Sequence, residues 1–176
     1  QVSALSTAQV SSLKTSQVAA LTPNQVVALG TQDFQALGTG AVQALSTAAV
    51  AALTTDQVAN MSTYQLGALQ TRQVLALRTD DIAALTTQQV VALNTRQSNV
   101  LNSDQVGALS TGQVRVLETQ DLAAIPTASI AGFSTDAIQA LSTDQVFALT
   151  PFQVEGLSAD QINAMSTPQF QSLHLG

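Results

Sequence analysis

The sequence predicts an all-α protein, an α-solenoid (superhelix) of very short capped helices with one helix in each eight-residue repeat. Three observations support this fold class: an unbroken period of eight, apolar residues three apart within each unit, and helix-capping residues at the start of each unit. The pattern covers all 176 residues, which divide into 22 units without insertion or deletion. We therefore expect a single array over residues 1–176, itself a fragment or subunit of a longer array.

The repeating unit is Thr-x-Gln-Val-x-Ala-Leu-x. The Leu position holds Leu in 18 of 22 units, and the Val position is apolar in all units but one, where Ser98 stands. Because residues three apart share one face of a helix, we expect the Val and Leu positions to form the core. The predicted core residues are Val10, Leu13, Val18, Leu21, Val26, Leu29, Val90, Leu93, Val146 and Leu149.

Two other folds are less consistent with this spacing. In a strand, residues three apart point to opposite faces, which argues against the alternative of a β-solenoid with eight residues per half-coil. In one long helix, the apolar stripe would drift by about 80° in each unit and soon circle the helix. An isolated helix of about five or six residues does not persist in water, so stacking between units must hold it. The pattern leaves open whether two or three units complete one superhelical turn.

A helix-capping signal opens each unit. Thr hydroxyls accept hydrogen bonds from free N–H groups at a helix start, so the predicted capping residues are Thr7, Thr15, Thr22, Thr150 and Thr167. Pro23, Pro151 and Pro168 each follow one of these Thr residues and would occupy the first helical position. Where Ser precedes Thr, as in "STDQ" at 142–145, a Ser-x-x-Gln capping box is a second register, and both registers remain open.

The composition argues against several classes of function. Only 9% of the residues are charged, the net charge is −6, and the five basic residues form no patch, so we expect no nucleic-acid partner. There is no Cys for disulfides or thiolate metal sites. No apolar run is long enough for a membrane span. The single histidine, His174, is interpreted as a tail residue.

No residue pattern is typical of catalysis or cofactor binding. Asp80 and Asp81 are adjacent in a predicted first turn, where they complement the helix dipole rather than form a catalytic pair. Gly-rich phosphate loops, a G-x-S-x-G motif and the EF-hand spacing are all absent. We therefore expect no enzymatic activity, no catalytic residue, no metal site and no cofactor.

The Gln and Thr columns of the repeat are the remaining candidates for a binding surface. We expect the Gln column, which includes Gln9, Gln17 and Gln25, to hydrogen-bond at helix ends or to form a side-chain ladder. The alternative is a polar strip that a glycan or another copy recognises. We expect the Thr column to cap helices, and the alternative is a Thr array that binds ice. Apolar residues at the variable positions, such as Val27 and Phe147, indicate lateral packing between copies.

Two resemblances bear on function. Residues 21–29, "LTPNQVVAL", resemble the opening helix of the repeat in transcription-activator-like effectors of plant pathogens. That match covers nine residues without the second helix or base-reading loop of that family, so no base-reading residue carries over. The whole chain is similar to the octapeptide arrays of the form "LTTxQVxAL" in large secreted or surface adhesin-like proteins of bacteria. This second resemblance implies an extracellular or bacterial cell-surface location and an extended structural part, with no binding residue.

These observations predict a structural extracellular repeat protein without catalytic activity, such as a stalk, a spacer, or a filament or adhesin subunit. The alternative is a binding surface for an extended ligand, a glycan or ice, along the Gln or Thr column. Neither the first nor the last unit has the polar face of a capping repeat. We therefore expect self-association, end-to-end or lateral, into fibres.

Overall fold

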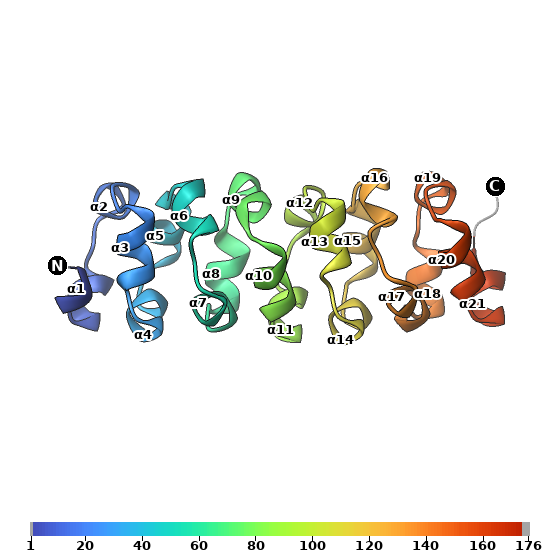
Figure 1. The fold of residues 1–176 in the computed structure, drawn as a ribbon, viewed down its shortest axis with the longest axis horizontal. Helices are drawn as coiled ribbons and strands as arrows, with labels where there is room; N and C mark the ends of the chain where they lie inside the picture. Colours follow the sequence, from blue (N-terminus) through green and yellow to red (C-terminus); the bar gives the residue numbers. More distant parts are fainter. Residues whose placement is uncertain (1, 174–176) are drawn as a thin grey trace. The chain divides into compact units, whose positions relative to one another are not determined.

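The structure, a computed structural model, describes residues 2–173. These residues form 21 short α-helices and one 3₁₀ helix, with no strand among them (Figure 1). The predicted all-α class with one helix per repeat is confirmed, and the β-solenoid alternative is wrong. Contacts divide the chain into two units, residues 1–85 (unit 1) and 86–176 (unit 2). His174 lies outside the described residues.

Unit 1 begins with the 3₁₀ helix and contains the first ten α-helices. Its elements are η1 (Val2–Ala4), α1 (Thr7–Ser11), α2 (Thr15–Ala19), α3 (Pro23–Ala28), α4 (Thr31–Gln35), α5 (Thr39–Ala44), α6 (Thr47–Ala51), α7 (Thr55–Ala59), α8 (Thr63–Ala68), α9 (Thr71–Ala76) and α10 (Thr79–Ala84).

Unit 2 contains the remaining helices. They are α11 (Thr87–Val91), α12 (Thr95–Ser98), α13 (Ser103–Gly107), α14 (Thr111–Arg115), α15 (Thr119–Ala124), α16 (Thr127–Ile130), α17 (Thr135–Ala140), α18 (Thr143–Phe147), α19 (Pro151–Glu155), α20 (Ala159–Ala164) and α21 (Thr167–Ser172).

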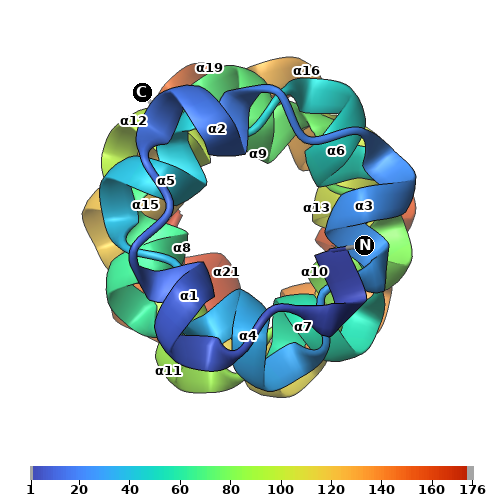
Figure 2. The same ribbon diagram turned by 90° about the vertical axis from the view of Figure 1, so that its left-hand side faces the viewer.

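Within each unit, a helix packs on the helix three places further along the chain. In unit 1 the stacked rows are α1–α4–α7–α10, α2–α5–α8 and α3–α6–α9. In unit 2 they are α11–α14–α17–α20, α12–α15–α18–α21 and α13–α16–α19. Figure 2 shows the first turn of unit 1, in which α1, α2 and α3 occupy three different sides. Three repeats therefore complete one turn, which decides between the two arrangements that the sequence left open.

The Val and Leu positions make the core of both units. Eight of the predicted core residues are buried: Val10, Val18, Val26, Leu29, Val90, Leu93, Val146 and Leu149. Leu13 and Leu21 are only partly buried. Both belong to the first turn of unit 1, where repeats pack on one side only. Val10 and Val18 of the same turn are buried, so in this turn the Val position is covered and the Leu position is covered only in part.

Candidate functional site: a buried amide ladder

Most helices begin one residue earlier than the Thr column predicts. Thr7, Thr15 and Thr167 are the first helical residues of α1, α2 and α21, so their assignment as N-caps is wrong. The N-caps of these helices are Ser6, Lys14 and Ser166. A residue at the first helical position is already in helical conformation, so its side chain is not placed to accept from the first-turn N–H groups.

The predicted caps Thr22 and Thr150 lie at the N-cap, because Pro replaces Thr at the next position. Their side chains accept hydrogen bonds from the backbone N–H of Gln25 and Gln153. Pro23 and Pro151 occupy the first helical position, as predicted, whereas Pro168 is the second residue of α21. The fixed φ of Pro suits either position, where no N–H is needed.

The second of the two capping registers is the one that the structure adopts. At "STDQ", Ser142 is the N-cap of α18 and its Oγ accepts from the Gln145 N–H at 3.1 Å. In return, the Gln145 Oε1 accepts from the Ser142 N–H at 2.9 Å. Two free N–H groups of the helix start are satisfied in this reciprocal pair.

The same Gln side chains also bind the preceding turn of the solenoid. Gln57 is the third residue of α7, and its Oε1 accepts from the Thr54 N–H at 3.0 Å. Its Nε2 donates to the carbonyl oxygens of Val26 at 2.9 Å and Leu29 at 2.8 Å, at the C-terminal end of α3. Carbonyls at a helix end lack the regular partner four residues on: the Val26 carbonyl accepts a backbone bond from the Leu29 N–H at 3.2 Å, and the Gln amide adds a second donor. One side chain therefore caps the start of its own helix and the end of a helix four places earlier.

This double contact repeats through both units, always to the carbonyls 28 and 31 residues earlier. We call the set the amide ladder: Gln57, Gln65 and Gln73 in unit 1, and Gln145, Gln153, Gln161 and Gln169 in unit 2. The bond to the carbonyl 28 residues earlier measures 2.7–2.8 Å in every case. All seven side chains are at most 4% exposed.

The amide is the chemical group that this position requires. Its oxygen accepts from the N-cap N–H while its two hydrogens are donated to carbonyls, whereas a Glu carboxylate of the same shape can only accept. A buried donor or acceptor without a partner costs about 1–3 kcal/mol. The recurrence of Gln is explained by this pairing of acceptor and donor.

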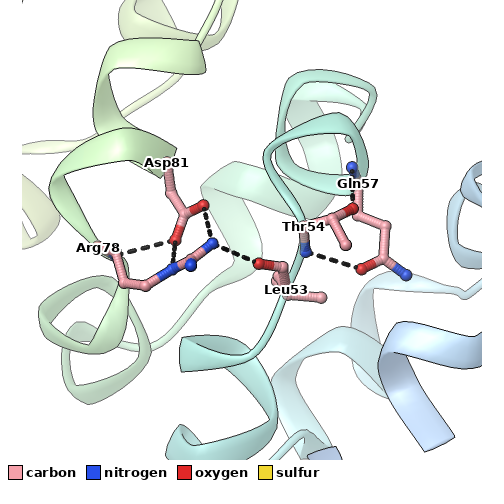
Figure 3. Close-up of polar contacts among 5 residues, drawn as sticks. All are labelled: Leu53, Thr54, Gln57, Arg78 and Asp81. Atoms are coloured by element: carbon pink, nitrogen blue, oxygen red, sulfur yellow. Dashed lines mark hydrogen bonds and ion pairs between the residues drawn. The ribbon is translucent and has the colours of Figure 1, made fainter. Parts of the chain in front are cut away.

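One helix start of unit 1 replaces the amide with an ion pair. In α10 the ladder position holds Asp81, whose Oδ2 accepts from the Arg78 N–H at 2.9 Å (Figure 3). The guanidinium of Arg78 bonds both Asp81 oxygens, and its Nη2 donates to the carbonyl of Leu53 at 2.8 Å. Leu53 is the residue 28 positions before Asp81, so Arg78 supplies the donor that Gln would have supplied. The hydrogen bond from Arg78 to Asp81 raises the pKa of Arg78 above its ordinary value.

In the sequence, the position of Asp81 in a first turn predicts only that it complements the helix dipole. The signal in the sequence is that two positions change together: Arg78 stands at the position before Thr, and Asp81 stands at the Gln position three residues later. Arg78 is half-exposed whereas the Asp81 side chain is fully buried. The pair lies within unit 1 and completes the ladder there with different chemistry.

A shorter donor replaces the amide at α16. Ser129 Oγ donates to the Leu101 carbonyl, again 28 residues earlier, at 2.8 Å. A Ser side chain is much shorter than Gln, so α16 must lie closer to α13, the helix on which it packs. Gly132 and Gly107 allow this approach: a Cβ on Gly107 would lie 2.9 Å from the Gly132 carbonyl oxygen, and a Cβ on Gly132 would collide with the Ser103 carbonyl. The glycines are needed here for close backbone contact.

At α15 the ladder position holds Asp121, a side chain with one oxygen unpartnered among the described residues. Asp121 is 3% exposed, and its Oδ1 has no hydrogen-bond partner in the described part of the chain. Burial raises the pKa of the Asp121 carboxyl, a hydrogen bond from the Thr95 hydroxyl lowers it, and the charge of Glu118 raises it further. Ser98, in α12 on which α15 packs, is fully buried with an unpartnered Oγ.

Gln9, Gln17 and Gln25, in the first turn, are exposed, unlike the ladder residues. The Gln column is therefore mostly interior, and outside this turn it does not form the surface strip that a glycan could read. The Thr column lies largely at the surface, since its residues stand at the first helical position. Large apolar side chains are exposed at six variable positions and at one Val position, Phe170; the variable positions are Val27, Tyr64, Leu75, Val91, Phe147 and Phe152.

Among residues 2–173, no helix is both long enough and apolar enough to cross a membrane. The fold and the ladder define the chain as an α-helical repeat protein of the solenoid class.

The ALTTAQ repeat family model matches residues 1–31, 26–63, 74–111 and 114–151. These ranges cover more than half of the sequence, so the chain belongs to the ALTTAQ repeat family. A comparison with curated proteins found no match.

Proposed function

We propose that this chain is a non-catalytic structural segment, a stalk, spacer or filament subunit of an adhesin-like protein that acts outside a bacterial cell. The observation that carries the proposal is the amide ladder, because its Gln side chains are buried and hydrogen-bonded to backbone carbonyls of the preceding turn. A repeat whose polar groups join successive turns is suited to extending a chain by identical steps. The similarity to octapeptide arrays of bacterial surface proteins supports the extracellular location.

A deletion that respects the turn tests the structural part of this proposal. Removing residues 54–77 takes out three whole repeats and joins Leu53 to Arg78 in phase. We expect this variant to fold with helical circular dichroism and cooperative denaturation, because each remaining helix still meets a neighbouring turn. Removing residues 54–73 breaks the phase at the junction, so unit 1 should be less stable and should denature less cooperatively than in the in-phase deletion. Loss of folding in the in-phase deletion would contradict a modular spacer.

The location needs a separate experiment. An antibody against the chain, applied to intact cells of the source organism with and without added protease, should detect a protease-sensitive surface antigen. An antigen that is protected until the cells are lysed would contradict an extracellular role.

A second candidate function is recognition of an extended ligand, a glycan or ice, by the Thr column. The observation that favours it is the exposure of Thr87, Thr111 and Thr135 on the stacked helices α11, α14 and α17, where their hydroxyls are not used for N-capping. Thermal hysteresis or a glycan-array signal that disappears when these three residues become Lys would support it. If the unchanged chain gives no signal in either assay, the candidate is wrong.

A further inference from the structure

Two buried carboxylates, Asp81 in unit 1 and Asp121 in unit 2, stand at the Gln position of the repeat. At Asp81 the compensating cation belongs to the chain: Arg78 Nη2 lies 3.0 Å from Asp81 Oδ1 and 2.8 Å from the Leu53 carbonyl oxygen (Figure 3). One cationic nitrogen therefore joins the carboxylate to the carbonyl 28 residues earlier. We call these three residues the α10 set. A buried carboxylate needs such a partner, because an uncompensated charge in the interior is costly.

At α15 no side chain takes the part of Arg78. The residue three positions before Asp121 is Glu118, whose negative charge opposes ionisation of Asp121 and raises its pKa. Among residues 2–173, no basic side chain forms an ion pair with Asp121, and its Oδ1 has no hydrogen-bond partner. The carboxylate is nevertheless only 3% exposed, so water does not compensate its charge as it does at the surface.

The carbonyl oxygen that corresponds to that of the α10 set belongs to Leu93. Leu93 lies 25 residues before Glu118 and 28 before Asp121, the same offsets as in the α10 set. The Thr95 hydroxyl, two residues after Leu93, donates to the Asp121 carboxylate, which brings this part of the chain to Asp121. One repeat later, at α16, the bond across 28 residues is still made. In the described part of the chain, no N–H or O–H group donates to the Leu93 carbonyl oxygen.

We propose that a monovalent cation of about the size of K⁺ binds between Asp121 Oδ1 and the Leu93 carbonyl oxygen, in the place that Arg78 Nη2 takes in the α10 set. The contacts of 2.8 and 3.0 Å in that set are longer than the oxygen contacts of Mg²⁺ and Ca²⁺, about 2.0–2.6 Å, which favours a larger ion. Backbone carbonyls are the ligands that replace the hydration shell of K⁺ in channels. One carboxylate also balances one positive charge. This site goes beyond the proposed structural function and does not rest on it.

Urea denaturation of the 176-residue chain tests the site, at neutral pH and constant ionic strength, in mixtures of potassium chloride and choline chloride. Choline is too bulky to lie between two buried oxygens. Because the ion binds the folded chain, the stability should rise with potassium and then follow a binding curve. At about ten times the dissociation constant, the unfolding equilibrium constant should be about elevenfold lower than in choline. Crystals grown in rubidium chloride should show an anomalous peak between Asp121 and the Leu93 carbonyl.

Two variants supply the missing group covalently. Asp121→Gln introduces the amide of the regular ladder, and Glu118→Arg rebuilds the α10 set. Both should be folded by circular dichroism, should be more stable than the unchanged chain in choline chloride, and should lose the potassium response. A matched control, Asp136→Arg, makes the same charge change as Glu118→Arg at an exposed position of α17. This control should keep the full response.

Equal stability of the unchanged chain in the two salts would overturn the cation site. A potassium response of undiminished size in Asp121→Gln and in Glu118→Arg would overturn it as well, because the ion would then act elsewhere on the chain. The in-phase deletion of residues 54–77 leaves this site untouched, so a failure of the cation site and a failure of the structural role are distinguishable.

Discussion

Two parts of unit 2 solve the same packing problem in different ways. In each of the helices α18 to α21, the third residue is Gln. Each of these four amides bonds its own helix start and the preceding turn, and all four side chains are buried. In α15 and α16 the equivalent residues are Asp121 and Ser129. One of these side chains leaves an oxygen unpartnered, and the other reaches its carbonyl only because glycines let the helices approach.

The comparison shows that the Gln side chain is long enough to bond carbonyls of the preceding turn, whereas the shorter Asp121 and Ser129 side chains need other arrangements. At α16 glycines allow a close backbone approach, and at α15 a buried carboxylate oxygen has no hydrogen-bond partner among the described residues. Each repeat contacts only its neighbours, and α15 and α16 stack on the regular helices α18 and α19 on one side. The same helices α15 and α16 lie against α12 and α13, which contain Ser98 and Gly107.

The largest effect should come from breaking the ladder at a regular position. Gln153→Glu keeps the acceptor for the Thr150 N–H but removes the donors to Leu122, Ala123 and Ile125 and buries a charge. We expect the free energy of unfolding to fall by about 3–5 kcal/mol, as for other uncompensated buried charges, in urea denaturation. The matched control is Gln17→Glu in the exposed first turn, which should change it by less than about 0.5 kcal/mol. Equal losses in both variants would disprove the bridging role.

The next test concerns the ion pair that substitutes for the amide. Arg78→Ala removes the guanidinium from the buried Asp81 carboxylate, which keeps only the backbone N–H of residue 78, and removes the side-chain donor to the Leu53 carbonyl. We expect a loss of about 2 kcal/mol, below the full cost of a broken buried pair because Arg78 is half-exposed. The double change Arg78→Thr and Asp81→Gln rebuilds the regular arrangement and should restore stability in the same denaturation assay. A double variant as unstable as Arg78→Ala would show that the positions are not equivalent.

A third test addresses the close approach of α13 and α16. Gly132→Ala forces its new Cβ against the Ser103 backbone, and we expect a loss of about 1–3 kcal/mol. Gly112→Ala, inside α14 with only the Ser110 Oγ nearby at 3.9 Å, should instead stabilise by roughly 0.5–1 kcal/mol through helix propensity. Thermal denaturation of both variants distinguishes a steric effect from a general effect of added methyl groups.

Ser98→Val should stabilise the repeat that contains α12. The change removes a buried hydroxyl without a partner and restores the apolar residue of the repeat. We expect a gain of about 1–2 kcal/mol, measured by denaturation and by slower amide hydrogen exchange in α12. Unchanged or lower stability would indicate that the hydroxyl has a partner in solution, such as a buried water.

The smallest effect is the pH dependence that Asp121 contributes. Its pKa is raised in the folded chain, so folding favours its protonated form. The contribution is fully present below the unfolded pKa, about 4, and is lost as the pH rises through the folded value. Asp121→Asn should therefore melt at a higher temperature than the unchanged chain at pH 7, and the difference should shrink as the pH falls toward 4. A difference that does not vary with pH would exclude titration of this group.

The local structure follows from short stretches of the sequence. The eight-residue spacing of Val and Leu, the position of Pro23 and Pro151 after a capping Thr, and the Ser-x-x-Gln signal concern groups within four residues of each other, where backbone sterics and short hydrogen bonds act independently of the rest of the chain. The sequence leaves open which residue is the N-cap, because Thr at the first helical position and Ser before it both carry hydroxyls.

The stacking of the helices and the bonds that Gln makes to the preceding turn depend on the tertiary structure. The amide of Gln57 meets carbonyls 28 and 31 residues away, and that meeting depends on three helices completing each turn, a geometry that packing of all repeats selects together. For the same reason, the sequence does not show that Arg78 donates to the Leu53 carbonyl, which lies 25 residues earlier in the chain. Interactions between turns depend on the rise and rotation of the whole coil, which no eight-residue window contains.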